Sequence, residues 1–224
     1  MKGERLTPRV LSARLIPNAS PGLCKALKLK KHYPTLALLT GDSDDVTYIA
    51  LDHATKAAAV EVVYARSLYA GAANASTALA GEVIGILGAQ TPSEGESGLR
   101  AAIEHVQQVA FYSANDRGDV VYLAHTVARS GSYLSSVAKV PHGSALAYLI
   151  APPLEAMVGI DAAMKAAGVE PGVIYLPPTE TNFAGALLTG TESACRAACT
   201  AFAEAVCEVA AQPISVKGDR YGIG

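Results

Sequence analysis

The chain has 224 residues, and its formal net charge of -2 argues against a general nucleic-acid-binding protein, whose phosphate contacts need a basic surface. Hydrophobic residues make up 50% of it and charged residues only 17%, against about 25% in ordinary soluble domains, so we expect other subunits to cover much of its surface. The length fits one large domain or two domains of about 110 residues.

The apolar runs of the chain do not predict a membrane span. In ALAYLIAPPLEAMVGI the run is broken by Pro152, Pro153 and Glu155. The N-terminal stretch MKGERLTPRV has no apolar core after its charges, so no secretory signal is predicted. We therefore expect the cysteines to be reduced thiols in a cytosol. They are Cys24, Cys195, Cys199 and Cys207.

Taken from the N-terminus, the first half predicts alternating strands and helices. A strand and a short helix are expected in ARLIPNASPGLCKALKL, from Ala13, and a second strand runs into an acidic turn at residues 42–45. ATKAAAVEVVYA, from Ala54, is typical of a helix followed by a strand, and EVIGILG, from Glu82, of a last strand. A helix follows with the apolar stripe Leu99, Ile103, Val106 and Ala110.

The acidic turn contains three carboxylates, Asp42, Asp44 and Asp45, and runs into residues 46–49 (VTYI), which taken alone are typical of a strand. From the residues alone, such a turn is most simply a solvated strand end or a turn cap. It lacks the spaced ligands, the glycine and the terminal glutamate of a calcium loop.

The second half of the chain repeats the first. AHTVARSGSYLSSVAKV, from Ala124, resembles the stretch from Ala13, and AMKAAGVEPGVIYL, from Ala163, resembles the stretch from Ala54. The order strand, short helix, strand, helix, strand, hairpin-like loop, strand and capped helix is therefore expected twice.

Each copy ends on a T-x-x-E pattern, in which a hydroxyl and a carboxylate cap the first free amides of a helix. The pattern pairs Thr91 with Glu94 in copy one and Thr189 with Glu192 in copy two. The apolar stripe of the second helix is Cys195, Cys199, Phe202, Val206 and Val209. We expect two α/β domains, residues 1–109 and 110–213, followed by a tail at residues 214–224.

Long strings of the sequence resemble a known family. GEVIGILGAQTPSEGESGLRAAIEHV and AGALLTGTESACRAACTAFAEAV resemble the closing strand and helix of the bacterial microcompartment domain, and LEAMVGIDAAMKAAGVE resembles its opening helix. In its tandem order, and in strings such as SGSYLS and PPTETNFAGALLTG, the chain is similar to tandem-domain shell proteins of the ethanolamine-utilisation type. The resemblance implies an α/β (α+β) fold of two circularly permuted microcompartment domains, each a small, mainly antiparallel sheet flanked by helices. It also implies a homotrimer with a pseudo-sixfold outline.

The function that this resemblance implies is structural and not enzymatic: a tile that joins other shell proteins in the shell of a bacterial microcompartment in the cytoplasm. The motifs agree, since Ser130-Gly131-Ser132 does not match a G-x-S-x-G nucleophile elbow and no glycine pattern matches a phosphate-binding loop. A tile of a compartment for another substrate and a metal-binding regulator that uses the acidic cluster stay open as alternatives. No cofactor is expected, and whether cobalamin passes or binds is left open.

The resemblance also implies a small acidic pore within each subunit that holds ethanolamine. The positions that match its lining are Asp44, Asp45, Glu82 and Phe111. Carboxylates suit an ammonium group, and an aromatic wall suits its apolar or cationic face. No native metal site is expected, although Asp44, Asp45 and Glu82 could collect a metal adventitiously.

In the single-domain relatives the loop between the last two strands lines a central pore. The matching loops here are residues 69–76 and 177–185, whose unequal composition favours a gate over a fixed ring. Gly71 and Gly185 could supply backbone freedom. The loop residues singled out are Tyr69, Gly71, Asn74, Thr179, Glu180, Thr181, Asn182 and Phe183.

Cysteines and histidines give weaker signals. Cys195, Cys199 and Cys207 have helical spacing, but the apolar stripe explains two of them as ordinary core residues. No two histidines have the spacing of a metal-binding pair, so we expect surface or structural roles for them. They are His32, His53, His105, His125 and His142.

Overall fold

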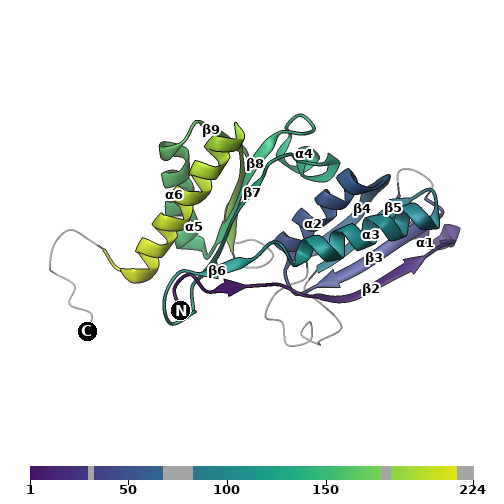
Figure 1. The fold of residues 1–224 in the computed structure, drawn as a ribbon, viewed down its shortest axis with the longest axis horizontal. Helices are drawn as coiled ribbons and strands as arrows, with labels where there is room; N and C mark the ends of the chain where they lie inside the picture. The colour runs from purple at the N-terminus through teal and green to yellow at the C-terminus, as the bar shows by residue number, and fades with distance from the viewer. Residues whose placement is uncertain (30–32, 68–82, 178–182, 216–224) are drawn as a thin grey trace.

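The computed structural model describes residues 1–29, 33–67, 83–177 and 183–215, and it contains two antiparallel sheets flanked by helices (Figure 1). The four-stranded sheet has the order β2 (Val10–Ile16), β3 (Thr35–Gly41), β5 (Val83–Ala89), β4 (Val60–Ser67). The six-stranded sheet has the order β1 (Arg5–Leu6), β6 (Phe111–Ser113), β7 (Val121–Val127), β8 (Ala145–Ala151), β10 (Ala184–Gly190), β9 (Val169–Tyr175). The helices are α1 (Pro21–Ala26), α2 (Asp44–Ala57), α3 (Pro92–Val106), α4 (Ser132–Ala138), α5 (Pro153–Ala166) and α6 (Glu192–Ala211).

The two halves have the same order of elements. The first runs β2, α1, β3, α2, β4, β5, α3, and the second runs β7, α4, β8, α5, β9, β10, α6. The predicted succession of strands and helices and the predicted pair of small antiparallel sheets are therefore confirmed. The expected hairpin-like loops lie mostly at residues 68–82 and 178–182, outside the described residues. Among the described helices, none is both long and apolar enough to cross a bilayer.

The stretch after the acidic turn is a helix, so the strand suggested by residues 46–49 is wrong. Ser43 has an extended backbone, and its hydroxyl accepts the N–H of Val46, which makes it the N-cap of α2. Asp44 and Asp45 occupy the first turn, where the helix dipole favours negative charge. Four β-branched or aromatic residues cannot by themselves distinguish a strand from one buried turn of a helix, whereas the cap can.

The caps of α3 and α6 differ. Thr91 and Glu94 form the predicted capping box, because the Thr91 hydroxyl accepts the Glu94 N–H and the Glu94 carboxylate accepts the Thr91 N–H. In copy two the predicted cap is shifted by two residues. Thr189 belongs to β10 and donates to the Ala145 carbonyl, while Thr191 caps α6 through the Ala194 N–H. The register of the ladder with β8 thus decides which threonine is free to cap.

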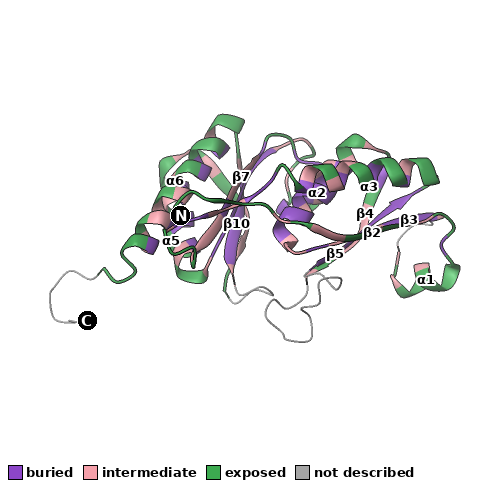
Figure 2. Cartoon of the chain, turned by 60° about the horizontal axis from the view of Figure 1, so that its bottom comes forward, coloured by how far each residue is buried: buried purple, intermediate pink, exposed green. Residues whose placement is uncertain are grey.

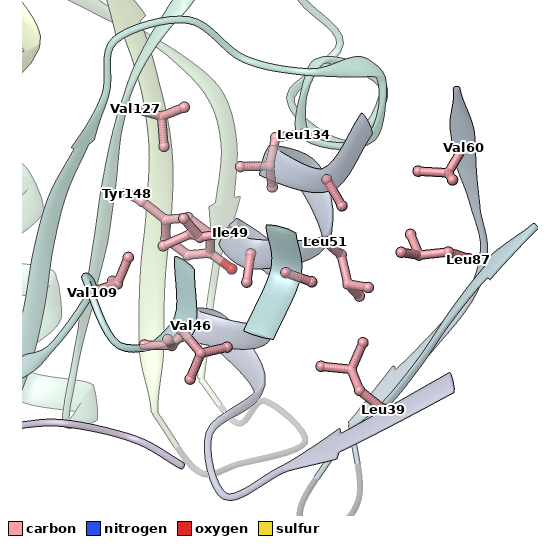
Figure 3. Packing of buried hydrophobic residues seen from close by; sticks show 14 of the residues in the cluster. Leu39, Val46, Ile49, Leu51, Val60, Leu87, Val109, Val127, Leu134 and Tyr148 are labelled. Atoms are coloured by element: carbon pink, nitrogen blue, oxygen red, sulfur yellow. The ribbon is translucent and has the colours of Figure 1, made fainter. Parts of the chain in front are cut away.

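Helix α2 lies between the two sheets. Leu39 and Leu87 of the four-stranded sheet face it from one side, and Tyr148 of the six-stranded sheet from the other, with Ile49 and Leu51 between them (Figure 3). A second core fills the space between the six-stranded sheet and the pair α5 and α6. One face of this sheet therefore packs on its own helices and the other on α2 and α4. Every residue of β8 is buried, and so is most of the neighbouring β10, which is labelled in Figure 2.

The N-terminal strand joins the distant sheet. Arg5 and Leu6 of β1 pair with Tyr112 and Phe111 of β6 instead of with the neighbouring β2. Backbone hydrogen bonds between Ser113 and both Gly3 and Glu4 extend this contact. Residues from the beginning of the chain thus form an edge of the six-stranded sheet.

Candidate binding site

The acidic pair occupies the N-terminal turn of α2, between the two sheets. The Asp44 carboxylate accepts hydrogen bonds from the Ser67 hydroxyl at 2.7 Å and from the Asp45 backbone N–H at 2.8 Å. The Asp45 carboxylate accepts a hydrogen bond from the Tyr148 hydroxyl at 2.8 Å. Ser67 ends β4 and Tyr148 lies in β8, so each carboxylate is oriented by a different sheet.

Burial controls the ionisation of Asp45. Only 8% of this residue is exposed, and desolvation raises its pKa well above the usual value. The neighbouring Asp44 raises the pKa of Asp45 further, and the hydrogen bond from Tyr148 partly opposes this rise. An uncompensated buried carboxylate that attracts a proton also attracts a cation, because either one removes the cost of burying the charge.

Two cavities meet at the acidic pair. One, of about 570 Å³, extends over Tyr48 and Tyr133 toward β9. The other, of about 390 Å³, extends toward β1 and Phe111. Asp44, Asp45 and Phe183 line both cavities. The carboxylates therefore separate two open spaces within one subunit, as they would at the narrow part of a passage.

The larger cavity has an aromatic wall. It is lined by Tyr48, Tyr133, Tyr148, Tyr175 and Phe183. The rings of Tyr48 and Tyr133 are tilted against each other with centroids 6.0 Å apart. Burial raises the pKa values of Tyr133, Tyr148 and Tyr175, so their hydroxyls stay protonated and their rings stay uncharged near neutral pH. Neutral rings beside carboxylates form an environment that favours an organic ammonium group.

The site contains three of the residues that the sequence assigns to it. Asp44, Asp45 and Phe111 lie together along the two cavities, and Phe111 packs against Phe183 with ring centroids 6.4 Å apart. Phe183, expected in a central-pore loop, is the first described residue after position 177 and lines both cavities. The remaining positions of both sets lie outside the described residues: Glu82, Tyr69, Gly71, Asn74, Thr179, Glu180, Thr181 and Asn182.

Gly185 has a different role from the expected loop hinge. It lies in β10 and pairs with Ile150 and Tyr175 on its two sides. A Cβ atom at this position would come within 2.3 Å of the Leu149 carbonyl oxygen and of the Ile150 side chain. Close packing between strands explains this glycine better than backbone freedom does.

Sequence reasoning missed the tyrosines of the larger cavity. Tyr148 is in a strand that is apolar throughout, and Tyr133 is in a short helix, so neither stands out along the chain. The repeat gives no signal for Tyr175 either, because Tyr175 pairs with Gly185 at the place where Arg66 pairs with Ile84 in the first copy.

The cysteine expectation holds for the buried positions of α6. Cys195 and Cys199 are buried free thiols in the second core, and burial raises the pKa of Cys199 to about 11, so this thiol is protonated at neutral pH. Within the described part of the chain, no group of three His, Cys, Asp or Glu side chains could hold a metal ion. The histidines are scattered in the sequence but converge in space: His53 and His105 stack with ring centroids 4.0 Å apart.

Known proteins resemble the chain over nearly its whole length. It is 59% identical over 215 residues to a bacterial microcompartment shell protein EutL of Clostridium perfringens (strain 13 / Type A), covering 96% of this chain and 99% of that protein. The crystal structure of the ethanolamine utilization protein EutL from Leptotrichia buccalis C-1013-b superposes with a TM-score of 0.93 at 55% identity, covering 96% of this chain and 100% of that one. No family model matches the chain.

A more distant structure shares the fold. A trimeric bacterial microcompartment shell protein, PduB, superposes with a TM-score of 0.74 at 22% identity, covering 91% of this chain and 89% of that one. The tandem arrangement of two antiparallel sheets flanked by helices is therefore that of the tandem microcompartment proteins, as expected. With more than half of its residues shared over nearly the full length, the chain belongs to the EutL family of bacterial microcompartment shell proteins.

Proposed function

We propose that this chain forms a trimeric tile of an ethanolamine-utilisation shell and that the two cavities meeting at Asp44 and Asp45 are the route of a small protonated amine through each subunit. The membership in a structural shell family excludes an enzyme and places the chain in a microcompartment shell with other shell proteins. The observation that carries the proposed route is that both cavities are lined by Asp44, Asp45 and Phe183.

Charge supports an amine as the cargo. The described residues that line the two cavities include three carboxylates, Asp42, Asp44 and Asp45, but no Lys, Arg or His. Of these, Asp42 forms an ion pair with Arg9 at 3.2 Å and is thereby partly neutralised. The pair Asp44 and Asp45 remains for a ligand, and rings of carboxylates favour cations in channels.

The exposed face of α5 supports the trimer. Helices α2 and α5 hold equivalent places in the repeat, and Ile49 of α2 is 2% exposed because the six-stranded sheet covers it. The equivalent Val158 of α5 is 44% exposed, and Leu154 and Met157 beside it are exposed as well. We infer that the four-stranded sheet of a neighbouring subunit covers this face of α5, as the second sheet covers α2 within the chain. Such heterologous contacts close into a ring of three subunits.

The route is tested by calorimetric titration of the trimer with ethanolamine and with ethylene glycol, a neutral molecule of similar size. We expect saturable binding of ethanolamine only, weakened at least about tenfold by Asp44→Asn combined with Asp45→Asn, because each charge-assisted hydrogen bond contributes roughly 1.5 to 3 kcal/mol. Glu96→Gln removes an exposed carboxylate from α3 and is the matched control. Equal affinity for both ligands, or unchanged affinity in the double variant, contradicts the proposed route.

The trimer is tested separately by light scattering, which should give a mass near three times 23.0 kDa. Val158→Lys should produce monomers, because it places a charge on the face that the neighbour covers. Exposed Lys2→Ala is expected to leave the mass unchanged. A wild-type chain that stays monomeric at micromolar concentration overturns the assembly, whatever the outcome for amine binding.

A further inference from the structure

A third cavity, of about 730 Å³, lies toward the C-terminal end of α2, away from the acidic pair at its N-terminal end. Residues from α2, α3 and β7, the segment after β7 and the turn before β8 surround it. Four of the five histidines of the chain line this cavity: His53, His105, His125 and His142. Neither the acidic passage nor the packing of the sheets accounts for this convergence.

The charges around the third cavity favour an anion. Lys56 and Arg129 line it, and its described lining contains no carboxylate. Asp52 lies behind the wall, fully buried, with its carboxylate held by backbone N–H groups of Gly131 and Leu134 and by Lys56 at 3.3 Å. The described residues offer no ion-pair partner to the exposed Arg129 guanidinium. The charge of Lys56 is thus compensated by Asp52, whereas the charge of Arg129 is not compensated by the described residues.

The histidines supply unused hydrogen-bonding capacity. His105 Nδ1 is buried and has no hydrogen-bond partner among the described residues. The rings of His53 and His105 lie parallel, with an interplanar angle of 5°, so their in-plane nitrogens cannot converge on one metal ion. A neutral imidazole carries one N–H donor, and a protonated one carries two. N–H groups that do not point at one common position suit a ligand that carries several acceptor oxygens.

We propose that this cavity binds a small oxyanion, a phosphate or carboxylate group, between Arg129 and Lys56 on one side and the stacked His53 and His105 on the other. The fork of Arg129 matches two oxygens of such a group and supplies the uncompensated charge. Lys56, which pairs with Asp52 and donates to the Arg129 carbonyl, contributes its remaining N–H. His125 lies on the same wall and His142 on the turn beside it. The lining of this third cavity shares no described residue with the two cavities proposed as the route of the amine.

Binding of an anion at this site takes up protons. Burial lowers the pKa values of His105 and His125 to about 4 and also lowers that of His53, so all three are neutral near pH 7. Lys56 lowers all three pKa values further, and His53 and His125 also lower the pKa of His105. Two groups act in the opposite direction: Asp52 raises the pKa of His53, and Gln108 raises the pKa of His105. A bound anion offsets the repulsion by Lys56 and raises these pKa values, so affinity increases as the pH falls.

The proposal is tested with sulfate, whose charge does not change between about pH 5.5 and about pH 7.5. Histidine ring signals of the intact trimer are followed by NMR during titration with sodium sulfate, with sodium chloride of equal ionic strength as reference and sodium acetate as the carboxylate probe. We expect a saturable response to sulfate or acetate beyond that to chloride, at least about threefold stronger at the lower pH. Comparison of the two probes tells whether a phosphate-like or a carboxylate group is preferred.

Two variants separate the anion site from a general effect of charge. Arg129→Gln should weaken sulfate binding at least about tenfold, whereas Arg117→Gln, which removes another exposed guanidinium far from the cavity lining, should leave it unchanged. His53→Gln combined with His105→Gln and His125→Gln should remove the pH dependence. No response beyond that to chloride, equal weakening by both arginine variants, or an unchanged pH dependence in the histidine variant overturns the proposal.

Discussion

The Asp52 carboxylate of α2 accepts the backbone N–H of Gly131 at 2.7 Å, across 79 positions of sequence. It also accepts the Leu134 N–H at 2.8 Å, and α4 has no side-chain cap of its own. Asp52 is therefore the N-terminal cap of a helix that belongs to the other half of the chain. The approach is so close that a Cβ atom on Gly131 would come within 2.5 Å of the Asp52 carbonyl oxygen.

We predict that Asp52→Asn lowers the free energy of unfolding by about 2 to 4 kcal/mol, because an amide accepts more weakly and its NH₂ group faces a backbone donor. Urea unfolding at a fixed subunit concentration measures the change. Glu96 of α3, which pairs with Arg100 four residues later, has a side chain that is 64% exposed. Its replacement by Gln should change stability by less than about 0.5 kcal/mol. Similar losses for the two variants would show that Asp52 is not a cap across the halves.

Asp45→Asn should stabilise the chain at neutral pH. The raised pKa of Asp45 means that the folded state keeps a proton that the unfolded state has lost, so stability decreases as the pH rises from the ordinary value of 3.8 through the folded pKa. Asparagine removes this decrease and can still accept the Tyr148 hydroxyl. We expect a gain on the order of 1 to 2 kcal/mol at pH 7 that vanishes in acid. Thermal unfolding across the pH range measures it, and a loss of stability at pH 7 would contradict the prediction.

Acid should destabilise the protein through two partly buried histidines. The pKa values of His105 and His125, about 4 against an ordinary 6.5, mean that the unfolded state binds more protons between these two values. The free energy of unfolding therefore falls as the pH drops from 6.5 to about 4, and this contribution is constant above 6.5. Replacing both histidines by Gln should flatten the fall in this window, as measured by urea unfolding at several pH values. An equally steep fall in the variant would assign the acid sensitivity to other groups.

The stability of the protein should fall more when the first-turn glutamate of α3 is removed than when that of α6 is removed. Thr91→Ala and Thr191→Ala each remove an N-cap hydroxyl and should cost about 1 kcal/mol or somewhat more. Glu94→Ala breaks the capping box of α3 and should cost more than Glu192→Ala, whose carboxylate forms an ion pair with the exposed Arg196 at 2.6 Å. Thermal unfolding of the four variants makes the comparison. A greater loss for Glu192→Ala would refute the reciprocal cap of α3.

Local patterns in the sequence predict most of the fold. The repeated strings give the same elements in both halves, and the capping box at Thr91 has its expected geometry. The copy-two cap was misplaced because T-x-x-E cannot tell a strand-ending threonine from a capping one, and only pairing of Thr189 with β8 decides. Residues 46–49 show the same limit, since their helical state depends on Ser43.

The candidate site could be predicted only in part, because its members come from segments far apart. Asp44 and Asp45 stand together in the sequence, but Tyr148 lies 103 positions from Asp45 and reaches it only because α2 is placed between the sheets. The third cavity was missed for the same reason. His53, His105 and His125 belong to three different elements, and a search for close spacing along the chain does not find them.

The pairing of β1 with β6 has a consequence for synthesis on the ribosome. The four-stranded sheet needs nothing beyond β5 and can form while the rest of the chain is being made, whereas Arg5 and Leu6 have no partner strand until Phe111 and Tyr112 emerge. Arg5 and Leu6 therefore stay unpaired while the four-stranded sheet folds, and they form their backbone hydrogen bonds only after β6 has been synthesised. Translation itself delays the last backbone bonds of the N-terminal strand, so the beginning of the chain is among the later parts to reach its final place.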